Sequence, residues 1–219
     1  MLIALSDFIS RTTPTGAALF LSWEGRHVFS IPRRELTHGG DRLRFFGVGG
    51  KRRSPDESWT DCALRESAEE IGAVVSAIHS AEQTYFLNAE GQVVTVRLLE
   101  SGLRPRLILE KRIHSAYGSL ASSQQSYYLL AFDASLRAKP QPSSEIAALL
   151  YLRDEHLRQM QQGRLHPDAC EQCPTLASLL NTGAKIDLQA GVQLSPEVTL
   201  VPHGTAAFLT HQQNPAWRV

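Results

Sequence analysis

The chain has 219 residues, of which 42% are hydrophobic, and its 22 basic and 22 acidic residues cancel in net charge. This length and apolar content are typical of a globular protein with one hydrophobic core. The balanced charge argues against a nucleic-acid polymer or an anionic membrane as the main partner, and no apolar run reaches the roughly 20 residues that cross a bilayer. The first ten residues lack the features of a signal peptide and the three cysteines do not suggest a secreted disulfide framework, so we expect a cytoplasmic location.

The first 60 residues are expected to be rich in strands. Residues 16–33 predict a hairpin, because apolar runs flank Glu24 and Gly25 and Pro32 ends the second run. Residues 43–58 predict a short strand that continues into a loop of glycines and basic residues. A strand-rich start of this kind indicates a sheet as the base of the fold.

A helix is expected directly after this loop. Ser58 is a suitable N-cap, with Asp61 at the third helical position of a capping box, and Gly72 is the expected stop. The apolar residues expected to anchor this helix to the core are Leu64, Ala68 and Ile71.

Strands and a second helix are expected in the rest of the chain. The strands lie on both sides of a turn at residues 88–91 and again at 126–136, and residues 146–163 begin as a strand and become helical at Arg153. Residues 101–125 are interpreted as an insertion or long loop with some helix. The sequence therefore predicts a mixed α/β fold over residues 1–163, followed by a C-terminal extension, 164–219, that packs on it and holds a short helix at 175–181.

Three glutamates of the predicted helix share one face. Glu66, Glu69 and Glu70 stand at positions i, i+3 and i+4, where like charges repel. Most acidic helix faces are simply solvated. Here, however, the face follows Gly49 and Gly50, whose backbone can approach a ligand closely. A hard divalent cation such as Mg²⁺ or Mn²⁺ would remove the repulsion and leave coordination positions for substrate phosphates.

The segment GGKRRSPDESWTDCALRESAEEIGA, residues 49–73, resembles the Nudix box, written G-x5-E-x7-R-E-U-x-E-E-x-G-U with U aliphatic. From Glu57 onward the fixed residues stand in register through Arg65 and the glutamates to Gly72. The loop between Gly50 and Glu57 has one extra residue, and Ser67 stands where an aliphatic residue is usual. Matches at this many positions are far more specific than a lone glycine motif.

The resemblance implies a Nudix-type α/β/α sandwich with a mixed sheet and a metal-dependent pyrophosphohydrolase. Its substrate would be a nucleoside diphosphate linked to another moiety, and its cofactor Mg²⁺ or Mn²⁺. Members of the family are often homodimers, which favours a homodimer here. The alternative is a catalytically weak Nudix-like domain that binds or senses a nucleotide. An isopentenyl diphosphate isomerase on the same fold needs a cysteine in a core strand, whereas Cys62 lies in the helix.

The same resemblance implies a role for each residue of the motif. The expected metal ligands are Glu66, Glu69 and Glu70, with a loop carbonyl near Gly49 or Gly50. Glu57 and Arg65 would form an ion pair between loop and helix, as a rigid, permanently charged guanidinium allows.

The remaining assignments concern the phosphates and the general base. Lys51, Arg52 and Arg53 follow the glycines and would face phosphates or form a solvated basic loop. The candidates for the general base are Glu70 and Glu145, the latter just before the strand expected at residue 146.

The pair Cys170 and Cys173 does not predict a zinc site. His166 lies nearby and His203 is a conceivable fourth ligand, but a structural site needs four ligands at suitable spacing and the chain has no second C-x2-C pair.

Overall fold

Strands dominate the fold, which we describe from a computed structural model for residues 2–7, 9–10, 12–38, 40–99, 102–114, 124–160 and 173–211. The strands are β1 (Leu2–Ile3), β2 (Thr15–Phe20), β3 (Ser22–Trp23), β4 (Arg26–Pro32), β5 (Arg42–Phe45), β6 (Val48–Lys51), β7 (Val75–His79), β8 (Thr84–Leu87), β9 (Val93–Leu98), β10 (Leu107–His114), β11 (Gln124–Leu136), β12 (Ile146–Leu152), β13 (Lys185–Leu188) and β14 (Thr199–Pro202). The helices are η1 (Leu5–Asp7), α1 (Glu35–His38), α2 (Trp59–Ile71), α3 (Asp154–Gln159), α4 (Leu176–Asn181) and α5 (Thr205–Leu209).

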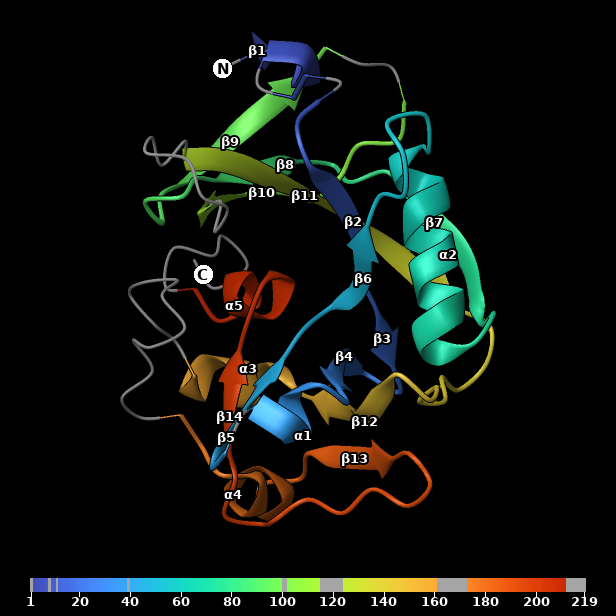
Figure 1. Cartoon of the computed structure of the whole chain (residues 1–219), viewed down its shortest axis with the longest axis vertical. Helices are drawn as coiled ribbons and strands as arrows, with labels where there is room; N and C mark the ends of the chain where they lie inside the picture. The colour runs from blue at the N-terminus through green and yellow to red at the C-terminus, as the bar shows by residue number, and fades with distance from the viewer. Residues whose placement is uncertain are drawn as a thin grey trace.

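The largest sheet has the strand order β1-β9-β8-β10-β11-β2-β6, with β7 paired to the far end of β11. It is mixed, because β10 runs antiparallel to β11 and parallel to β8, while β11 runs parallel to β2. Figure 1 shows this sheet across the upper half of the molecule. The mixed sheet with its few helices confirms the predicted mixed α/β class.

A second sheet, in the order β13-β12-β4-β3, lies below the first (Figure 1). The expected hairpin is present: β3 and β4 pair across Glu24 and Gly25, both of which have positive φ. The chain thus passes from β2 in the large sheet directly into β3 of the second. Strands β2 and β12 are buried along their whole length, as continuous apolar runs predict.

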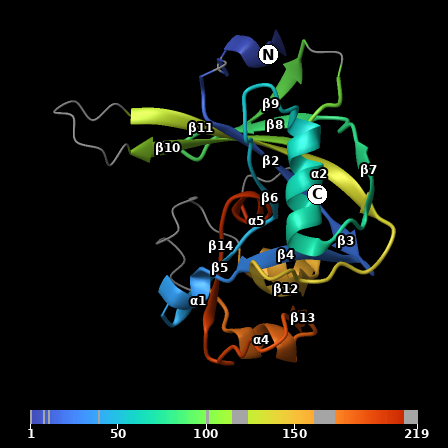
Figure 2. The ribbon, with the colours of Figure 1, turned by 45° about the vertical axis from the view of Figure 1, so that its right-hand side comes forward.

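Helix α2 packs against β6, β2 and β7 and spans the distance between the two sheets in both views (Figures 1 and 2). Its ends are as predicted, since Ser58 Oγ accepts from the Asp61 backbone N–H at the N-cap and Gly72 forms the C-cap with φ 82°. The prediction of its buried face was wrong. Leu64 and Ala68 are exposed, and the residues that pack inward besides Ile71 are Cys62, Ala63 and Ser67.

The interpretation of residues 101–125 as an insertion or loop was also wrong for the part that the structure describes. Residues 107–114 form β10, which lies between β8 and β11 inside the large sheet. Leu107, Ile108 and Leu109 are buried there, whereas the charged second half of the strand borders the cavity described below.

The later part of the chain extends sheets built by the earlier part. β13 pairs with β12, and β14 pairs with β5. The expected short helix is α4, capped by Thr175. The division into residues 1–163 and an extension, and the homodimer, remain predictions. His166 and Cys170 lie outside the described residues, and Cys173 is disulfide-bonded. None of the described helices is long and apolar enough to cross a membrane.

Candidate active site

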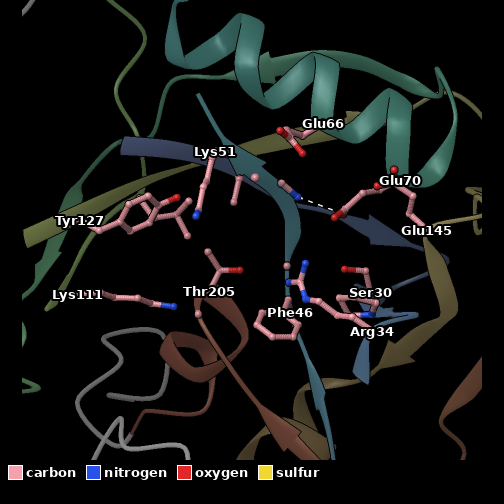
Figure 3. A pocket seen from close by; sticks show the side chains of 17 residues that line it. Ser30, Arg34, Phe46, Lys51, Glu66, Glu70, Lys111, Tyr127, Glu145 and Thr205 are labelled. Atoms are coloured by element: carbon pink, nitrogen blue, oxygen red, sulfur yellow. Dashed lines mark hydrogen bonds between the residues drawn. The ribbon is translucent and has the colours of Figure 1, made fainter. Parts of the chain in front are cut away.

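A cavity of about 500 Å³ lies between the two sheets, beneath α2 (Figure 3). Acidic and basic side chains from separate elements line it: Glu66 and Glu70 from α2, Glu145 from the turn before β12, Lys51 from β6, Arg34 from the turn after β4, and Lys111 from β10. The cavity therefore brings together residues that are far apart in the sequence.

Glu70 is the most perturbed carboxylate of this cavity. Its pKa is raised to about 8, mainly by burial and in addition by the neighbouring carboxylates of Glu66 and Glu145. Two groups act in the opposite direction: the Gly49 N–H, which donates to Glu70 Oε2 at 3.3 Å (the dashed line in Figure 3), and the Arg34 guanidinium. Burial and the two neighbouring carboxylates thus favour the protonated form of Glu70 in the metal-free cavity.

Gly49 and Gly50 bring the backbone of β6 against the acidic face of α2. Gly49 has φ 147°, and a Cβ at this position would overlap the carbonyl oxygen of Ala17. A Cβ at Gly50 would overlap the carboxylate of Glu66. Backbone atoms leave room only for glycine at Gly49, and at Gly50 an added Cβ would displace the Glu66 side chain, so the close approach that the sequence predicted for this loop is present.

Arg65 of α2 links this helix to the loop that follows β6. Its Nε donates to Glu57 Oε1 at 2.7 Å, its Nη1 to Glu66 Oε1 at 2.7 Å, and its Nη2 to the carbonyl oxygen of Lys51 at 3.0 Å. The hydrogen bond from Arg65 lowers the pKa of Glu57. The predicted ion pair between Glu57 and Arg65 is therefore present, and Arg65 also restrains one of the expected metal ligands.

Glu69 does not line the cavity. It is bound by Arg53 Nη2 at 2.7 Å and by Arg65 Nη1 at 3.3 Å, and 41% of its side chain is exposed. Of the three expected metal ligands, the structure thus brings Glu66 and Glu70 to the cavity and leaves Glu69 at its outer edge, paired with arginines.

The donor set fits a hard divalent cation in its chemistry. Glu66 and Glu70 present carboxylates beside the backbone of Gly49 and Gly50, and oxygen donors of this kind suit Mg²⁺ and Mn²⁺. Across the described ranges, however, no three His, Cys, Asp or Glu side chains form a ready-made metal cage. Arg65 binds Oε1 of Glu66, and Oε2 lies on the side of Gly50, where it could bind a cation.

Two of the three basic residues after Gly50 make contacts that stabilise the loop itself. Arg52 donates to the carbonyl oxygen of Glu57 at 2.6 Å and stacks on the Trp59 ring at 5.0 Å, and Arg53 pairs with Glu69. Of the three basic residues considered as phosphate ligands, only Lys51 lines the cavity.

Sequence reasoning missed several cavity residues, among them Arg34, Lys111 and Thr205. Lys111 and Tyr127 stand directly opposite each other on β10 and β11. Burial lowers the pKa of Lys111 to about 8 and raises that of Tyr127. Residues 107–113 are an apolar run followed by three charged residues, a pattern that does not alternate and from which strand register cannot be read.

His203, considered above as a zinc ligand, instead packs edge-on against the Phe46 ring at 5.0 Å. Burial and the charges of Lys111, Arg44 and Arg34 lower its pKa to about 3. A neutral histidine in a positive field is consistent with a packing role.

No family model and no curated protein sequence matches the chain. Solved structures similar to it include many Nudix hydrolases and MutT proteins. The MutT protein from Methanosarcina mazei Go1 is 15% identical, with a TM-score of 0.41 over 70% of this chain and 86% of that one. The E. coli dihydroneopterin triphosphate pyrophosphohydrolase is 14% identical, with a TM-score of 0.40 over 64% and 81%. An ADP-ribose pyrophosphatase from Streptococcus suis is 13% identical, with a TM-score of 0.37 over 66% and 76%. Likeness at this level assigns no activity to the chain.

Proposed function

We propose that the chain is a divalent-cation-dependent hydrolase that cleaves a phosphoanhydride bond in a nucleoside diphosphate linked to another moiety. The observation that carries this proposal is the burial of Glu70 in a cavity that it shares with Glu66 and Glu145. Burial disfavours the charged form of Glu70 in the empty site, and a dication with its diphosphate would stabilise that charged form. The resemblance of residues 49–73 to the Nudix box supports the same reading.

Glu66 and Glu70 are the proposed cation ligands, together with a carbonyl of Gly49 or Gly50. The resemblance adds Glu69, which would first have to leave Arg53. When bound, Mg²⁺ or Mn²⁺ supplies charge neutralisation on the diphosphate and Lewis acidity. Lys51 is placed to contact a phosphate, because it is a cation on the strand that carries both glycines.

The proposed reaction is a displacement at phosphorus. A water oxygen forms the new bond to phosphorus while the bond from that phosphorus to the bridging oxygen breaks. The bridging oxygen leaves with the other phosphoryl group, and a carboxylate accepts the proton of the water. Glu145 and Glu70 are the two candidates for that carboxylate, and both line the cavity.

The test is an assay of the purified full chain with Mg²⁺ or Mn²⁺ and a panel of nucleotide sugars, dinucleotides and nucleoside triphosphates. We expect phosphate-ester products from at least one compound, with loss of turnover in Glu70→Gln and Glu66→Gln. Glu155→Gln, an exposed glutamate on α3, is the matched control and should keep full activity. Turnover that survives Glu70→Gln, or that persists in EDTA, would refute the proposal.

The second candidate is a nucleotide-binding domain without chemistry. The observation that favours it is that arginines already occupy Glu66 and Glu69. The same panel separates the two functions, because binding of a nucleotide by calorimetry with no product under any metal supports the binding domain.

A further inference from the structure

The cavity contains cationic and hydroxyl groups that the proposed hydrolysis does not use. Lys111 reaches in from β10, and Figure 3 shows its amino group beside Thr205, across the cavity from Glu66 and Glu70. Its Nζ lies 3.8 Å from the position that a Cβ on Gly204 would take. Lys111 and Thr205 thus form the end of the cavity that is remote from the acidic helix.

This end holds polar atoms that lack partners within the described part of the chain. No carboxylate there lies within 4.0 Å of Lys111 Nζ, and neither this amino group nor the hydroxyl of Thr205 has a hydrogen-bond partner there. Thr205 is only 2% exposed. Elsewhere on the cavity wall, the buried hydroxyl of Ser30 is likewise unpaired. Of these three groups the Ser30 hydroxyl is a fully buried atom, and Lys111 and Thr205 line the cavity. A cation and hydroxyls that line one cavity without protein partners indicate that a ligand completes them.

The ligand group at this end should be an anion. Lys111, Arg44 and Arg34 together produce a positive field, which is felt at His203. Arg44 is already neutralised by Glu35 at 2.8 Å, and Arg34 acts on the Glu70 carboxyl. Of these three cations, Lys111 is therefore the one available to bind an anionic group other than the diphosphate.

We infer that Lys111 and Thr205 receive a second anionic group, a phosphate or a carboxylate, carried by the part of the substrate that extends beyond the diphosphate. This inference rests on the proposed function, because the diphosphate at Glu66 and Glu70 sets the orientation of the substrate. It narrows the substrate class to nucleoside diphosphate derivatives that carry a further anionic group, either on the nucleoside or on the linked moiety.

The test uses three matched pairs of compounds that differ by one anionic group. Coenzyme A and dephospho-coenzyme A differ by a 3′-phosphate, NADPH and NADH by a 2′-phosphate, and UDP-glucuronate and UDP-glucose by a sugar carboxylate. Dissociation constants are measured by calorimetry with Ca²⁺ in place of Mg²⁺ or Mn²⁺, so that a cation still holds the diphosphate, and product analysis checks that no compound is hydrolysed during the titration. We expect the more anionic member of at least one pair to bind about tenfold tighter or better, which is typical of a charge-assisted hydrogen bond in a buried site. The phosphate and carboxylate pairs identify which anion is taken.

Variants then assign the preference to this end of the cavity. Lys111→Met should reduce the preference for the more anionic member to less than about twofold, without weakening the binding of the less anionic member. Thr205→Val should reduce the same preference in part. Lys111→Arg, which keeps the charge, should retain it. Lys185→Met, at an exposed lysine paired with Glu24, is the matched control and should bind as wild type does.

Two results would overturn the inference. One is a wild-type protein that prefers the more anionic member in none of the pairs. The other is equal weakening of both members by Lys111→Met, which would assign Lys111 to the diphosphate itself. Failure of the hydrolase proposal is recognised separately: the preference would be present with Ca²⁺, yet no compound would be hydrolysed with Mg²⁺ or Mn²⁺.

Discussion

Arg65 and Glu57 form a two-point ion pair, with Nε–Oε1 at 2.7 Å and Nη2–Oε2 at 3.3 Å, and both side chains are less than one fifth exposed. Glu57 Oε2 also accepts from the backbone N–H of Arg53 at 2.7 Å. This pair fixes the start of α2 to the loop after β6, and so fixes the spacing between Glu66 and the two glycines.

Replacing Arg65 by lysine should destabilise the fold, because an ammonium group cannot bind Glu57, Glu66 and the Lys51 carbonyl at once. We expect a loss of about 1–3 kcal/mol in the free energy of unfolding, measured with urea. Arg53→Lys is the matched control from the same loop: its exposed pair with Glu69 should contribute less than about 1 kcal/mol. Equal losses in the two variants would contradict the anchoring role of Arg65.

Glu70, Glu66 and Glu69 should differ in their contribution to cation binding. If the cavity holds Mn²⁺, saturating metal at about 100 times its dissociation constant should stabilise the wild type by roughly 2.7 kcal/mol. Glu70→Gln should lose most of this stabilisation, whereas Glu69→Gln should lose least, because Glu69 stands outside the cavity in two arginine pairs. Thermal unfolding with and without Mn²⁺ measures the order, and Glu155→Gln should behave as wild type. A larger loss in Glu69→Gln than in Glu70→Gln would show that the arginine pairs open on metal binding.

Helix α2 was predictable from sequence because its signals are local. Ser58 caps the N-terminus, Gly72 ends the helix, and the seven-residue spacing between Glu57 and Arg65 places their charges together. The face that packs inward was not predictable from hydrophobicity. Helix α2 lies close against β6 and β2, and small residues such as Cys62 and Ala63 allow this approach while the larger Leu64 points outward.

The residues remote from the motif were not predictable, since their positions depend on strand pairing. Strand β10 combines a buried apolar start with a charged second half, so its pattern is neither that of a buried strand nor that of a clean alternation. Lys111 faces Tyr127 only because β10 and β11 pair in one particular register. The positions of Thr205 and Arg34 likewise follow from how the sheets are arranged, which is a property of the whole chain.

Lys111 should give the stability of the protein a measurable pH dependence. Its pKa is about 8 in the folded state and near 10.5 when unfolded, so between these values the unfolded chain binds more protons. The free energy of unfolding should therefore rise with pH through this window as the buried charge is lost. Lys111→Met should be more stable than wild type at pH 7, by on the order of 1–3 kcal/mol, and the difference should shrink by pH 10.

Urea unfolding at several pH values in a phosphate-free buffer checks this prediction, because a bound anion would mask the effect. The control is Lys185→Met, whose exposed side chain should leave the pH profile of the wild type unchanged. A constant difference between wild type and Lys111→Met from pH 7 to 10 would show that packing, not charge, separates them.

Gly49 and Gly50 should respond differently to alanine, although they are neighbours in the same strand. At Gly49 the φ of 147° is unfavourable for alanine and the added Cβ would overlap the Ala17 backbone, which cannot move aside. Gly49→Ala should therefore cost about 2 kcal/mol or more in the free energy of unfolding.

At Gly50 the overlap is with the Glu66 carboxylate, the end of a flexible side chain. Gly50→Ala should therefore unfold at nearly the same urea concentration as wild type and instead lose affinity for Mn²⁺, measured by calorimetry, because Glu66 is pushed from its place. Gly102→Ala, where a Cβ meets nothing within 4 Å, is the control for both measurements. If Gly50→Ala bound Mn²⁺ as wild type does, Glu66 would not be a cation ligand, and Glu70 and Glu145 would be the remaining carboxylates of the cavity to hold the metal.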